Sequence, residues 1–295
     1  PAVLAARART LGLTAKIEPV DAPAAAPSLF AKVLPVLPVP IGGNVVAGHP
    51  NSAAAGAVRQ SIEQAVALVR GGEASAVVTN PISKALLTHA GFAFPGHTEF
   101  LAALAGRASS DAVMMLVGGD LKVVPVTIHM PLKEVMGALT ETRIVKTLLT
   151  TAHDLGRYFG LARSRIAVTG LNPHAGEDGT MGREEIDVIL PAIEAARRQG
   201  LDVTGPHSAD TLFRAEARKT YDVAVAMYHD QALIPVKTLA FDTSVNVTLG
   251  LPFVRTSPDH GTAFALAGTG KASPRSLIEA LRLADTMLHH PEAEP

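Results

Sequence analysis

Residues 223–229 read Val-Ala-Val-Ala-Met-Tyr-His (VAVAMYH), an uninterrupted apolar run that ends in a histidine. The run has the length and the valine content of a buried strand. Two other runs share this arrangement: VPVTIH ends at His129, and IAVTGLNPH reaches His174 five residues after its last threonine. Three strands that each lead into a histidine predict a sheet with imidazoles along one edge.

Amphipathic stretches of helical length separate these runs from one another. We expect further strands over 75–79, 112–117 and 245–248, and helices over 54–70, 140–159, 183–199 and 275–289. Thr140 is a suitable side-chain cap for the second of these helices. The turn signal Gly118-Gly119-Asp120 predicts a hairpin between 112–117 and 122–128. Strands that alternate with helices indicate an α/β fold.

Composition restricts the possible chemistry. The 295 residues include 11 His but no Cys, which excludes a disulfide scaffold, a Cys-ligated metal and a cysteine nucleophile. Lys and Arg number 26 against 27 Asp and Glu, without the basic excess typical of nucleic-acid binding. No apolar run reaches the roughly 18 residues of a membrane span, and no signal peptide is found. We therefore expect a cytoplasmic protein, of one large or two medium domains, without nucleic-acid or membrane partners.

His129, His174 and His229 are the candidate metal ligands. They fall at or just after the carboxyl ends of expected strands, where open α/β sheets bind their ligands. Three imidazoles gathered there would suit a catalytic divalent metal with one open position. The alternative is three partly buried histidines that hydrogen-bond at strand ends, and their wide spacing does not separate the two interpretations.

A second group of polar residues could bind an anionic substrate. His97 and Thr98 open an expected helix, whose first backbone amides attract anions; alternatively, Thr98 only caps this helix. Lys237, Asn246 and Arg255 could hold a phosphate or carboxylate. In the alternative interpretation the two cations are solvated surface charges.

Asp210, within Ala-Asp-Thr-Leu-Phe, could orient a ligand or accept a proton, or it could only cap a helix. Glycine-rich phosphate loops are missing: no G-x-G-x-x-G follows a strand, and no G-x-x-x-x-G-K-[ST] occurs. No G-x-S-x-G nucleophile motif occurs either. Any dinucleotide must therefore bind by another route.

Five blocks of sequence stand in the order and spacing of one known family. They are VVTNPISKALLTHAGFAFPGHTEFLA (77–102), TGLNPHAGEDGTMGREEID (169–187), GPHSADTLF (205–213), AMYHDQALIPVK (226–237) and VNVTLGLPFVRTSPDHGTAFALAG (245–268). Together they resemble the 4-hydroxythreonine-4-phosphate dehydrogenase family of pyridoxal phosphate biosynthesis. The resemblance implies two interleaved α/β domains with a central cleft, as in isocitrate and isopropylmalate dehydrogenases. Residues 1–95 and 255–295 would form the first domain and 96–254 the second.

The same resemblance implies an NAD- or NADP-linked enzyme that uses a divalent metal: zinc, magnesium or cobalt. By this resemblance the metal ligands are His129, His174 and His229, and the catalytic residue is Asp210. The implied substrate contacts are His97, Thr98, Lys237, Asn246 and Arg255. The implied cofactor loop consists of His260, Gly261, Thr262 and Ala263. In the family both subunits contribute ligands to the site. A homodimer with its active site at the subunit interface is therefore expected.

The expected reaction oxidises 4-phosphonooxy-L-threonine to a β-keto acid, which decarboxylates to 3-amino-2-oxopropyl phosphate. The alternatives are a dehydrogenase of another phosphorylated hydroxy acid such as a phosphorylated sugar acid, a phosphate acyltransferase of related fold, and an inactive metal-binding protein. The family's N-terminal strand and its GDPAGIGPE-type loop are not found, so the chain is expected to begin after them. Ala265 and Thr269 stand where the family commonly has an acidic residue and a lysine.

Overall fold

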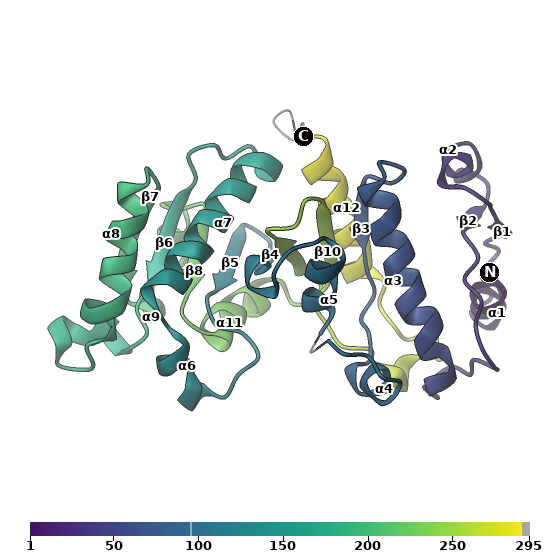
Figure 1. Ribbon diagram of the computed structural model, residues 1–295, viewed down its shortest axis with the longest axis horizontal. Coiled ribbons are helices and arrows are strands. Elements are labelled where there is room, and N and C mark those ends of the chain that lie inside the picture. Colours follow the sequence, from purple (N-terminus) through teal and green to yellow (C-terminus); the bar gives the residue numbers. More distant parts are fainter. Residues whose placement is uncertain (95, 291–295) are drawn as a thin grey trace. The chain divides into compact units, whose positions relative to one another are not determined.

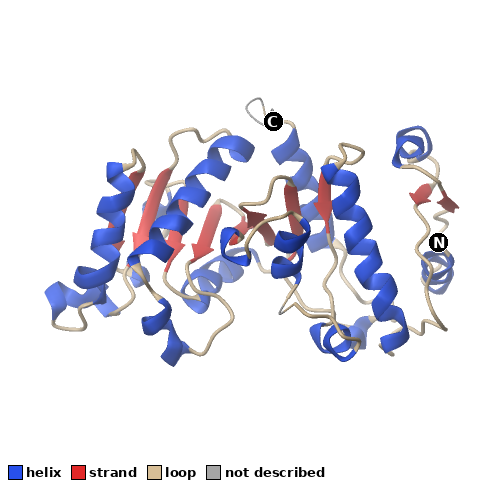
Figure 2. Ribbon diagram, viewed as in Figure 1, coloured by secondary structure: helices blue, strands red, loops and turns tan. Residues whose placement is uncertain are grey.

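The computed structural model describes residues 1–94 and 96–290, and it shows a mixed α/β fold (Figures 1 and 2). This confirms the fold class. Pro95, next to the expected anion site, and residues 291–295, at the end of the expected first domain, lie outside the described residues. The chain forms two compact units. Unit 1 contains Pro1–Ser109 and His260–Pro274, and unit 2 contains Ser110–Asp259 and the chain from Arg275 onward, so the units are interleaved along the sequence.

Unit 1 combines helices with short strands. Its helices are α1 (Ala2–Thr10), α2 (Ala26–Leu29), α3 (Ala55–Arg70), α4 (Lys84–His89) and α5 (His97–Leu104), its strands are β1 (Ile17–Pro19), β2 (Leu34–Val36) and β3 (Ala76–Val78), and its short helical turns are η1 (Pro23–Ala25), η2 (Ser52–Ala54) and η6 (Phe264–Leu266). Strands β1 and β2 pair in parallel. Arg70 of α3 donates a hydrogen bond to the Leu104 carbonyl at the end of α5 (2.6 Å). The buried Phe100 of α5 packs edge-on against Phe92.

Unit 2 contains the larger sheet. Its strands are β4 (Val113–Gly118), β5 (Leu121–Pro125), β6 (Arg165–Thr169), β7 (Asp202–His207), β8 (Val223–Ala226), β9 (Val245–Leu249) and β10 (Val254–Pro258). Its helices are α6 (Leu132–Ala138), α7 (Glu141–Phe159), α8 (Leu190–Arg198), α9 (Ala209–Leu212), α10 (Ala215–Arg218), α11 (His229–Ala240) and α12 (Arg275–Leu288), with short turns η4 (Pro173–Gly179) and η5 (Glu185–Ile189), while the turn η3 (Ser109–Asp111) lies where the chain first passes from unit 1 to unit 2.

The strands of unit 2 are hydrogen-bonded in the order β10-β9-β4-β5-β8-β6-β7. Strands β5, β8, β6 and β7 run parallel to their neighbours in this order. Strands β10, β9, β4 and β5 are joined by antiparallel pairing, including the predicted β4–β5 hairpin. Figure 2 shows the parallel arrows pointing the same way. The carboxyl ends of β5, β8 and β6 therefore meet along one edge of the sheet.

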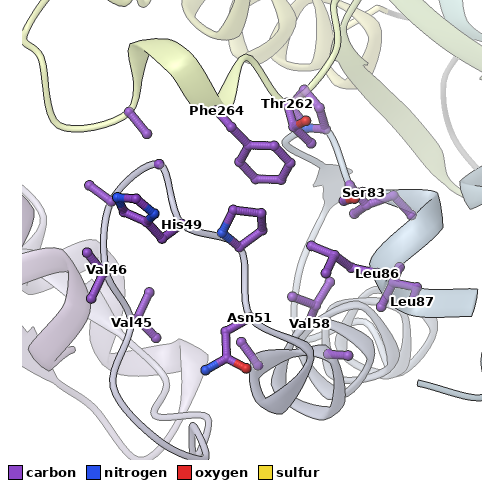
Figure 3. Close-up of a pocket in the computed structure, with 18 of the residues that line it drawn as sticks. Val45, Val46, His49, Asn51, Val58, Ser83, Leu86, Leu87, Thr262 and Phe264 are labelled. Atoms are coloured by element: carbon purple, nitrogen blue, oxygen red, sulfur yellow. The ribbon is translucent and has the colours of Figure 1, made fainter. Parts of the chain in front are cut away.

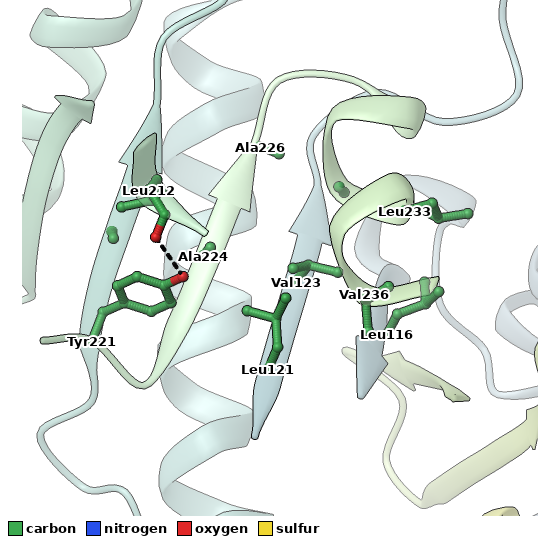
Figure 4. Packing of buried hydrophobic residues seen from close by; sticks show 11 residues of the cluster. Leu116, Leu121, Val123, Leu212, Tyr221, Ala224, Ala226, Leu233 and Val236 are labelled. Atoms are coloured by element: carbon green, nitrogen blue, oxygen red, sulfur yellow. Dashed lines mark hydrogen bonds between the residues drawn. The ribbon is translucent and has the colours of Figure 1, made fainter. Parts of the chain in front are cut away.

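Alternating side chains of the sheet form a core with α11. Ala224 and Ala226 of β8 point to the same face as Val123 of β5, and Leu233 and Val236 of α11 cover them (Figure 4). The buried Tyr221 joins this cluster and donates a hydrogen bond to the Leu212 carbonyl (3.2 Å). Small alanines on β8 leave room for the larger side chains of the helix. This packing fixes α11, and with it the residue that begins it, His229.

Helix α7 has the periodicity of a helix that packs on one side. Thr140 accepts a hydrogen bond from the Arg143 amide, which confirms the predicted cap. The buried side chains recur every three or four residues, as expected of one helix face: Ile144, Thr147, Leu148, Thr151, Asp154, Leu155 and Tyr158. Gly160 ends the helix in a left-handed conformation (φ 65°).

Some elements differ from the expectations. The helix expected over 183–199 begins as the wide turn η5 and becomes regular only at α8, because Pro191 cannot supply a backbone N–H inside a helix. Strands β7 and β10 were not expected. Helix α12 and β10 belong to unit 2, where α12 packs on β9 and β10, whereas the expected first domain included both. No helix among residues 1–94 and 96–290 is long and apolar enough to traverse a lipid bilayer.

Candidate active site

Three neighbouring strands lead to the three candidate metal ligands. His129 follows β5, His229 follows β8 and begins α11, and His174 follows β6 in η4. Strand β8 lies between β5 and β6, so His129 and His229 come from adjacent strands. Their ring centroids are 5.6 Å apart, with 45° between the ring planes. The structure therefore brings these two imidazoles together, as the sequence predicts.

The His229 ring is oriented by a neighbouring carboxylate. Its Nδ1 lies 2.7 Å from Oδ1 of Asp230. A carboxylate accepts hydrogen bonds, so Nδ1 is the donor in this contact, which leaves Nε2 as the ring nitrogen that could bind a metal. A carboxylate or carbonyl on the second ring nitrogen is the usual companion of a metal-ligating histidine.

His174 lies on a backbone of unusual conformation and is exposed to solvent. Its φ is 53°, in the left-handed region, and the next four residues also have positive φ. Within the described part of the chain, no group of three or more His, Cys, Asp or Glu side chains could hold a metal ion. One chain thus assembles two of the three expected ligands. His129 is exposed as well, so the partly buried histidines of the alternative interpretation are not observed at these two positions.

Gln231 links the ends of two of these strands, and the sequence did not single it out. Its Oε1 accepts hydrogen bonds from the Thr169 hydroxyl (2.8 Å) and the Met227 amide (2.7 Å). Its Nε2 donates to the Gly170 carbonyl (2.8 Å). The side chain thereby connects the carboxyl end of β6 to that of β8. The sequence feature that could have identified Gln231 is its place two residues after His229, in Tyr-His-Asp-Gln.

The candidate anion site of unit 1 lies at the start of α5. Gly96 is the residue that precedes the helix, and His97 and Thr98 form its first turn, so Thr98 is not the cap. A Cβ placed on Gly96 would lie 3.3 Å from Nζ of Lys84 and 2.8 Å from a carboxylate oxygen of Glu99. A cation and an anion therefore flank the helix start. The sequence did not identify Lys84, which lies in the Asn-Pro-Ile-Ser-Lys stretch of the first matched block.

The candidate cations of unit 2 are not solvated surface charges. Arg255 on β10 is 4% exposed and donates from Nη1 to the Thr248 hydroxyl (2.8 Å). Burial lowers the pKa of its guanidinium to about 10, which leaves it charged at neutral pH. Lys237 on α11 is half-buried and lies 3.0 Å from the Asp259 carboxylate. These contacts contradict the interpretation of both cations as surface charges.

Asn246 shares one face of the sheet with Arg255. In the β9–β10 register Asn246 lies opposite Ser257. Thr248, two residues further along β9, meets Arg255. Because residues two apart on a strand point to the same side, Asn246 and Arg255 both point to this face. The structure thus supports a common location for two of the three residues that were expected to hold a phosphate.

Asp210 lies in the first turn of α9 and is exposed. Its Oδ1 accepts a hydrogen bond from the hydroxyl of Ser208 (2.6 Å), the residue that precedes the helix. Helix α9 packs against η4, which carries His174. The carboxylate therefore belongs to the same region of unit 2 as the third candidate ligand.

The expected cofactor segment, His260–Ala263, belongs to unit 1. Ala263 has a positive φ of 45°, and Nδ1 of His260 lies 2.9 Å from the Gly261 carbonyl. Thr262 lines a pocket of about 270 Å³ whose walls are largely apolar (Figure 3). Other residues of the lining are Val46, His49, Asn51, Leu86 and Phe264. The cavity has the apolar lining and the few polar groups typical of a small-molecule site.

Comparison with known proteins places the chain among biosynthetic dehydrogenases. Residues 1–284 match the family described as pyridoxal phosphate biosynthetic protein PdxA. A 4-hydroxythreonine-4-phosphate dehydrogenase of Methylorubrum extorquens is 57% identical over 299 residues, spanning 99% of this chain and 84% of the relative. The enzyme of the same name from Bradyrhizobium diazoefficiens is 54% identical over 296 residues, spanning 97% and 86% of the two chains.

Solved structures agree with these sequence matches. The crystal structure of 4-hydroxythreonine-4-phosphate dehydrogenase from Klebsiella pneumoniae has a TM-score of 0.84 and 38% identity, over 95% of this chain and 87% of that one. A terephthalate 1,2-cis-dihydrodiol dehydrogenase from Burkholderia xenovorans has a TM-score of 0.64 and 32% identity, over 85% and 80% of the two chains.

Proposed function

The chain belongs to the PdxA family of pyridoxal phosphate biosynthetic proteins, and from this premise we propose that it oxidises 4-phosphonooxy-L-threonine with NAD or NADP. Hydride leaves C3 for the nicotinamide, the hydroxyl proton is released, and the resulting β-keto acid loses carbon dioxide to give 3-amino-2-oxopropyl phosphate. One observation carries the proposal: dehydrogenases named for this substrate are 57% and 54% identical over nearly the whole chain. The proposal includes a cytoplasmic location, as expected of a biosynthetic enzyme.

The histidines at the ends of β5 and β8 fit a divalent metal: zinc, magnesium or cobalt. Two imidazoles that share a tetrahedral metal have ring centroids about 5–5.5 Å apart, close to the 5.6 Å between His129 and His229. The contact of Asp230 with the far nitrogen of His229 supports the same role. We propose that His174 completes the set across a homodimer interface. The lack of a three-donor group among the described residues of one chain supports a ligand from the second subunit.

When bound, the metal supplies Lewis-acid stabilisation of the negative charge that develops on substrate oxygen. Asp210 is proposed to accept the proton of the C3 hydroxyl. Its carboxylate is exposed, and Ser208 holds one of its oxygens at 2.6 Å, which leaves the other oxygen available to a substrate.

The substrate phosphate is assigned to the five residues that the family resemblance implies. These are His97 and Thr98 at the start of α5, and Lys237, Asn246 and Arg255 of unit 2. The burial of Arg255 strengthens its attraction for an anion, because bulk water does not screen it. The shared sheet face of Asn246 and Arg255 supports the assignment.

The adenosine half of the cofactor is assigned to the pocket beside Thr262. The segment His260–Ala263 forms part of unit 1 together with this cavity, and the Phe264 ring and the apolar walls suit a planar base. Such a site would explain how a dinucleotide binds without a glycine-rich loop.

The test is NAD(P)H formation at 340 nm by the purified protein, with 4-phosphonooxy-L-threonine as substrate. We expect activity that a chelator abolishes and an added divalent metal restores. Absence of turnover with this substrate, combined with turnover of a phosphorylated sugar acid, would contradict the proposal in favour of the other phosphorylated hydroxy acids. The acyl-transfer alternative has support only at the level of the fold, from a branched-chain phosphotransacylase of Enterococcus faecalis with 16% identity and a TM-score of 0.52.

A further inference from the structure

The turn that carries His174 adopts a conformation that its own sequence does not favour. Residues His174 to Asp178 have φ values of 53°, 52°, 80°, 41° and 54°, all in the left-handed region. Only Gly176 among them lacks a Cβ. Non-glycine residues are disfavoured in this region because the Cβ approaches the backbone carbonyl. Contacts from outside the turn must therefore hold it in place.

The carboxylate of Glu185 supplies these contacts. Its Oε1 accepts hydrogen bonds from the amides of Leu171 and Asn172, both at 2.7 Å. Its Oε2 accepts one from the side-chain amide of Asn172 (3.0 Å). Glu185 is 3% exposed, so water does not compete for these bonds. Two of the three donors are backbone groups of the residues just before Pro173 and His174.

The turn also wraps closely around this carboxylate. A Cβ on Gly176 would lie 2.5 Å from Oε2 of Glu185, and a Cβ on Gly170 would lie 2.9 Å from Oε1. The carboxylate thus contacts the chain both before and after His174. Glu185 itself begins η5, which leads directly into α8. The left-handed turn is therefore anchored on a regular helix of unit 2.

We propose that Glu185 is a positioning residue for His174: its buried carboxylate fixes the left-handed turn and thereby the direction in which the imidazole is presented. The inference rests on the proposed role of His174 as a metal ligand. Glu185 does not contact the metal or the substrate in this proposal. It sets the geometry of a ligand whose backbone would otherwise relax to the right-handed region.

The variant Glu185→Gln tests the proposal with little change in shape. The amide oxygen can still accept from the two backbone amides, but the amide nitrogen then faces the Asn172 side-chain donor. Hydrogen–deuterium exchange on the metal-free protein should become faster at the backbone amides of residues 171, 172 and 174–178. Cobalt(II) titration should show affinity about 10–100-fold weaker, with an altered visible spectrum of the bound ion. The thermal midpoint of the metal-free protein should stay within a few degrees.

Glu184→Gln is the matched control. Glu184 accepts a hydrogen bond from the side chain of Asn172 (2.7 Å), and in the described part of the chain it accepts none from a backbone amide of the turn. We expect wild-type exchange and cobalt affinity for this variant. An equal effect of both variants would overturn the proposal, because the Asn172 side chain rather than the Glu185 carboxylate would then hold the turn.

If Glu185→Gln does not fold, Gly176→Ala tests the same contact by changing the turn instead of the carboxylate. Its new Cβ meets Oε2 of an intact Glu185, so it should loosen the turn and weaken cobalt binding in the same way. Faster exchange with unchanged cobalt affinity, or unchanged exchange, would refute the positioning role. Failure of the proposed function is recognised separately: His174→Ala would then bind cobalt like the wild type, whereas the exchange result for Glu185→Gln would still stand.

Discussion

The two ends of the β6–β8 strand pair are held by different chemistry. At the amino end, Arg165 and Asp222 form a charged pair with N···O distances of 2.8 and 3.2 Å, and the Arg165 amide donates to the same carboxylate. At the carboxyl end, the neutral side chain of Gln231 joins the strands. The charged pair stabilises the strands far from the candidate ligands. The neutral amide of Gln231 adds no charge beside the candidate metal ligands.

Removing a ligand at the carboxyl end should have the largest effect. His174→Ala is expected to reduce metal-dependent turnover by on the order of a thousandfold or more, because a three-ligand site loses one donor. The exposed side chain contributes little to packing, so the thermal midpoint should hardly change. Initial rates and bound metal, measured by elemental analysis, check this. Full activity of His174→Ala after chelator treatment would contradict the assignment of His174 as a metal ligand.

Removing the Gln231 side chain should lower both activity and stability. Gln231→Ala leaves the Thr169 hydroxyl, the Met227 amide and the Gly170 carbonyl without this partner. We expect a loss of about 2 kcal/mol in unfolding free energy and roughly tenfold lower kcat. Urea unfolding and steady-state kinetics measure the two effects. Gln199→Ala, at an exposed position after α8, is the control and should change neither. Wild-type kinetics for Gln231→Ala would show that the hydrogen bonds of Gln231 do not affect the candidate active site.

Removing the charged pair should affect stability alone. Asp222→Asn is expected to lower the unfolding free energy by about 1 kcal/mol, since Arg165 is partly solvent-exposed. The hydrogen bonds from Arg165 lower the pKa of the Asp222 carboxyl in the folded protein. This stabilisation is present above the unfolded-state pKa of about 3.9 and is lost as the pH falls below it.

The difference in unfolding free energy between wild type and Asp222→Asn should therefore have its whole value at pH 7 and become smaller below about pH 4. Urea unfolding at both pH values measures it, with Asp242→Asn at an exposed position as control. A lowered kcat for Asp222→Asn at pH 7 would contradict the separation between the two ends of the strand pair.

A small effect, on stability alone, is expected at the start of α7. Thr140→Ala removes the side-chain acceptor of the Arg143 amide and should lower stability by about 1 kcal/mol. Thr140→Ser keeps the hydroxyl and should retain most of that stability. Thermal unfolding compares the three proteins, and their kcat values should agree. A change in kcat would mean that α7 influences the site.

The sequence predicted those elements whose local residue pattern matches the position that they take in the fold. Apolar runs that end in histidine predicted β5, β6 and β8, and Thr140 before an amphipathic stretch predicted the start of α7. Strand β7 contains Gly205 and Pro206, residues that weaken a strand pattern, and β10 contains Arg255, a residue type usually exposed. Their places depend on neighbouring strands that a local pattern does not reveal.

The same limit applies to the candidate site. The sequence predicted that His129 and His229 come together, because each lies within four residues of the carboxyl end of a strand. It did not predict the left-handed turn at His174, since four of the six consecutive residues with positive φ (174–179) are not glycine. Neither Glu185 nor Gln231 was singled out, because each acts through hydrogen bonds to backbone groups distant in the sequence or across strands. Their roles become visible only from the partners of each oxygen and nitrogen.

The adjacency of β5 and β8 limits how far apart the first two candidate ligands, His129 and His229, can lie. Hydrogen-bonded strands lie about 4.8 Å apart, and the Val126 and Thr127 amides continue this pairing to Ala226 and Met227, two residues before each histidine. His174 has no such constraint, because a turn sets its position. Evolutionary adjustment of any preference for one ion over another is therefore expected to act on the His174 turn, while the positions of the other two candidate ligands stay fixed.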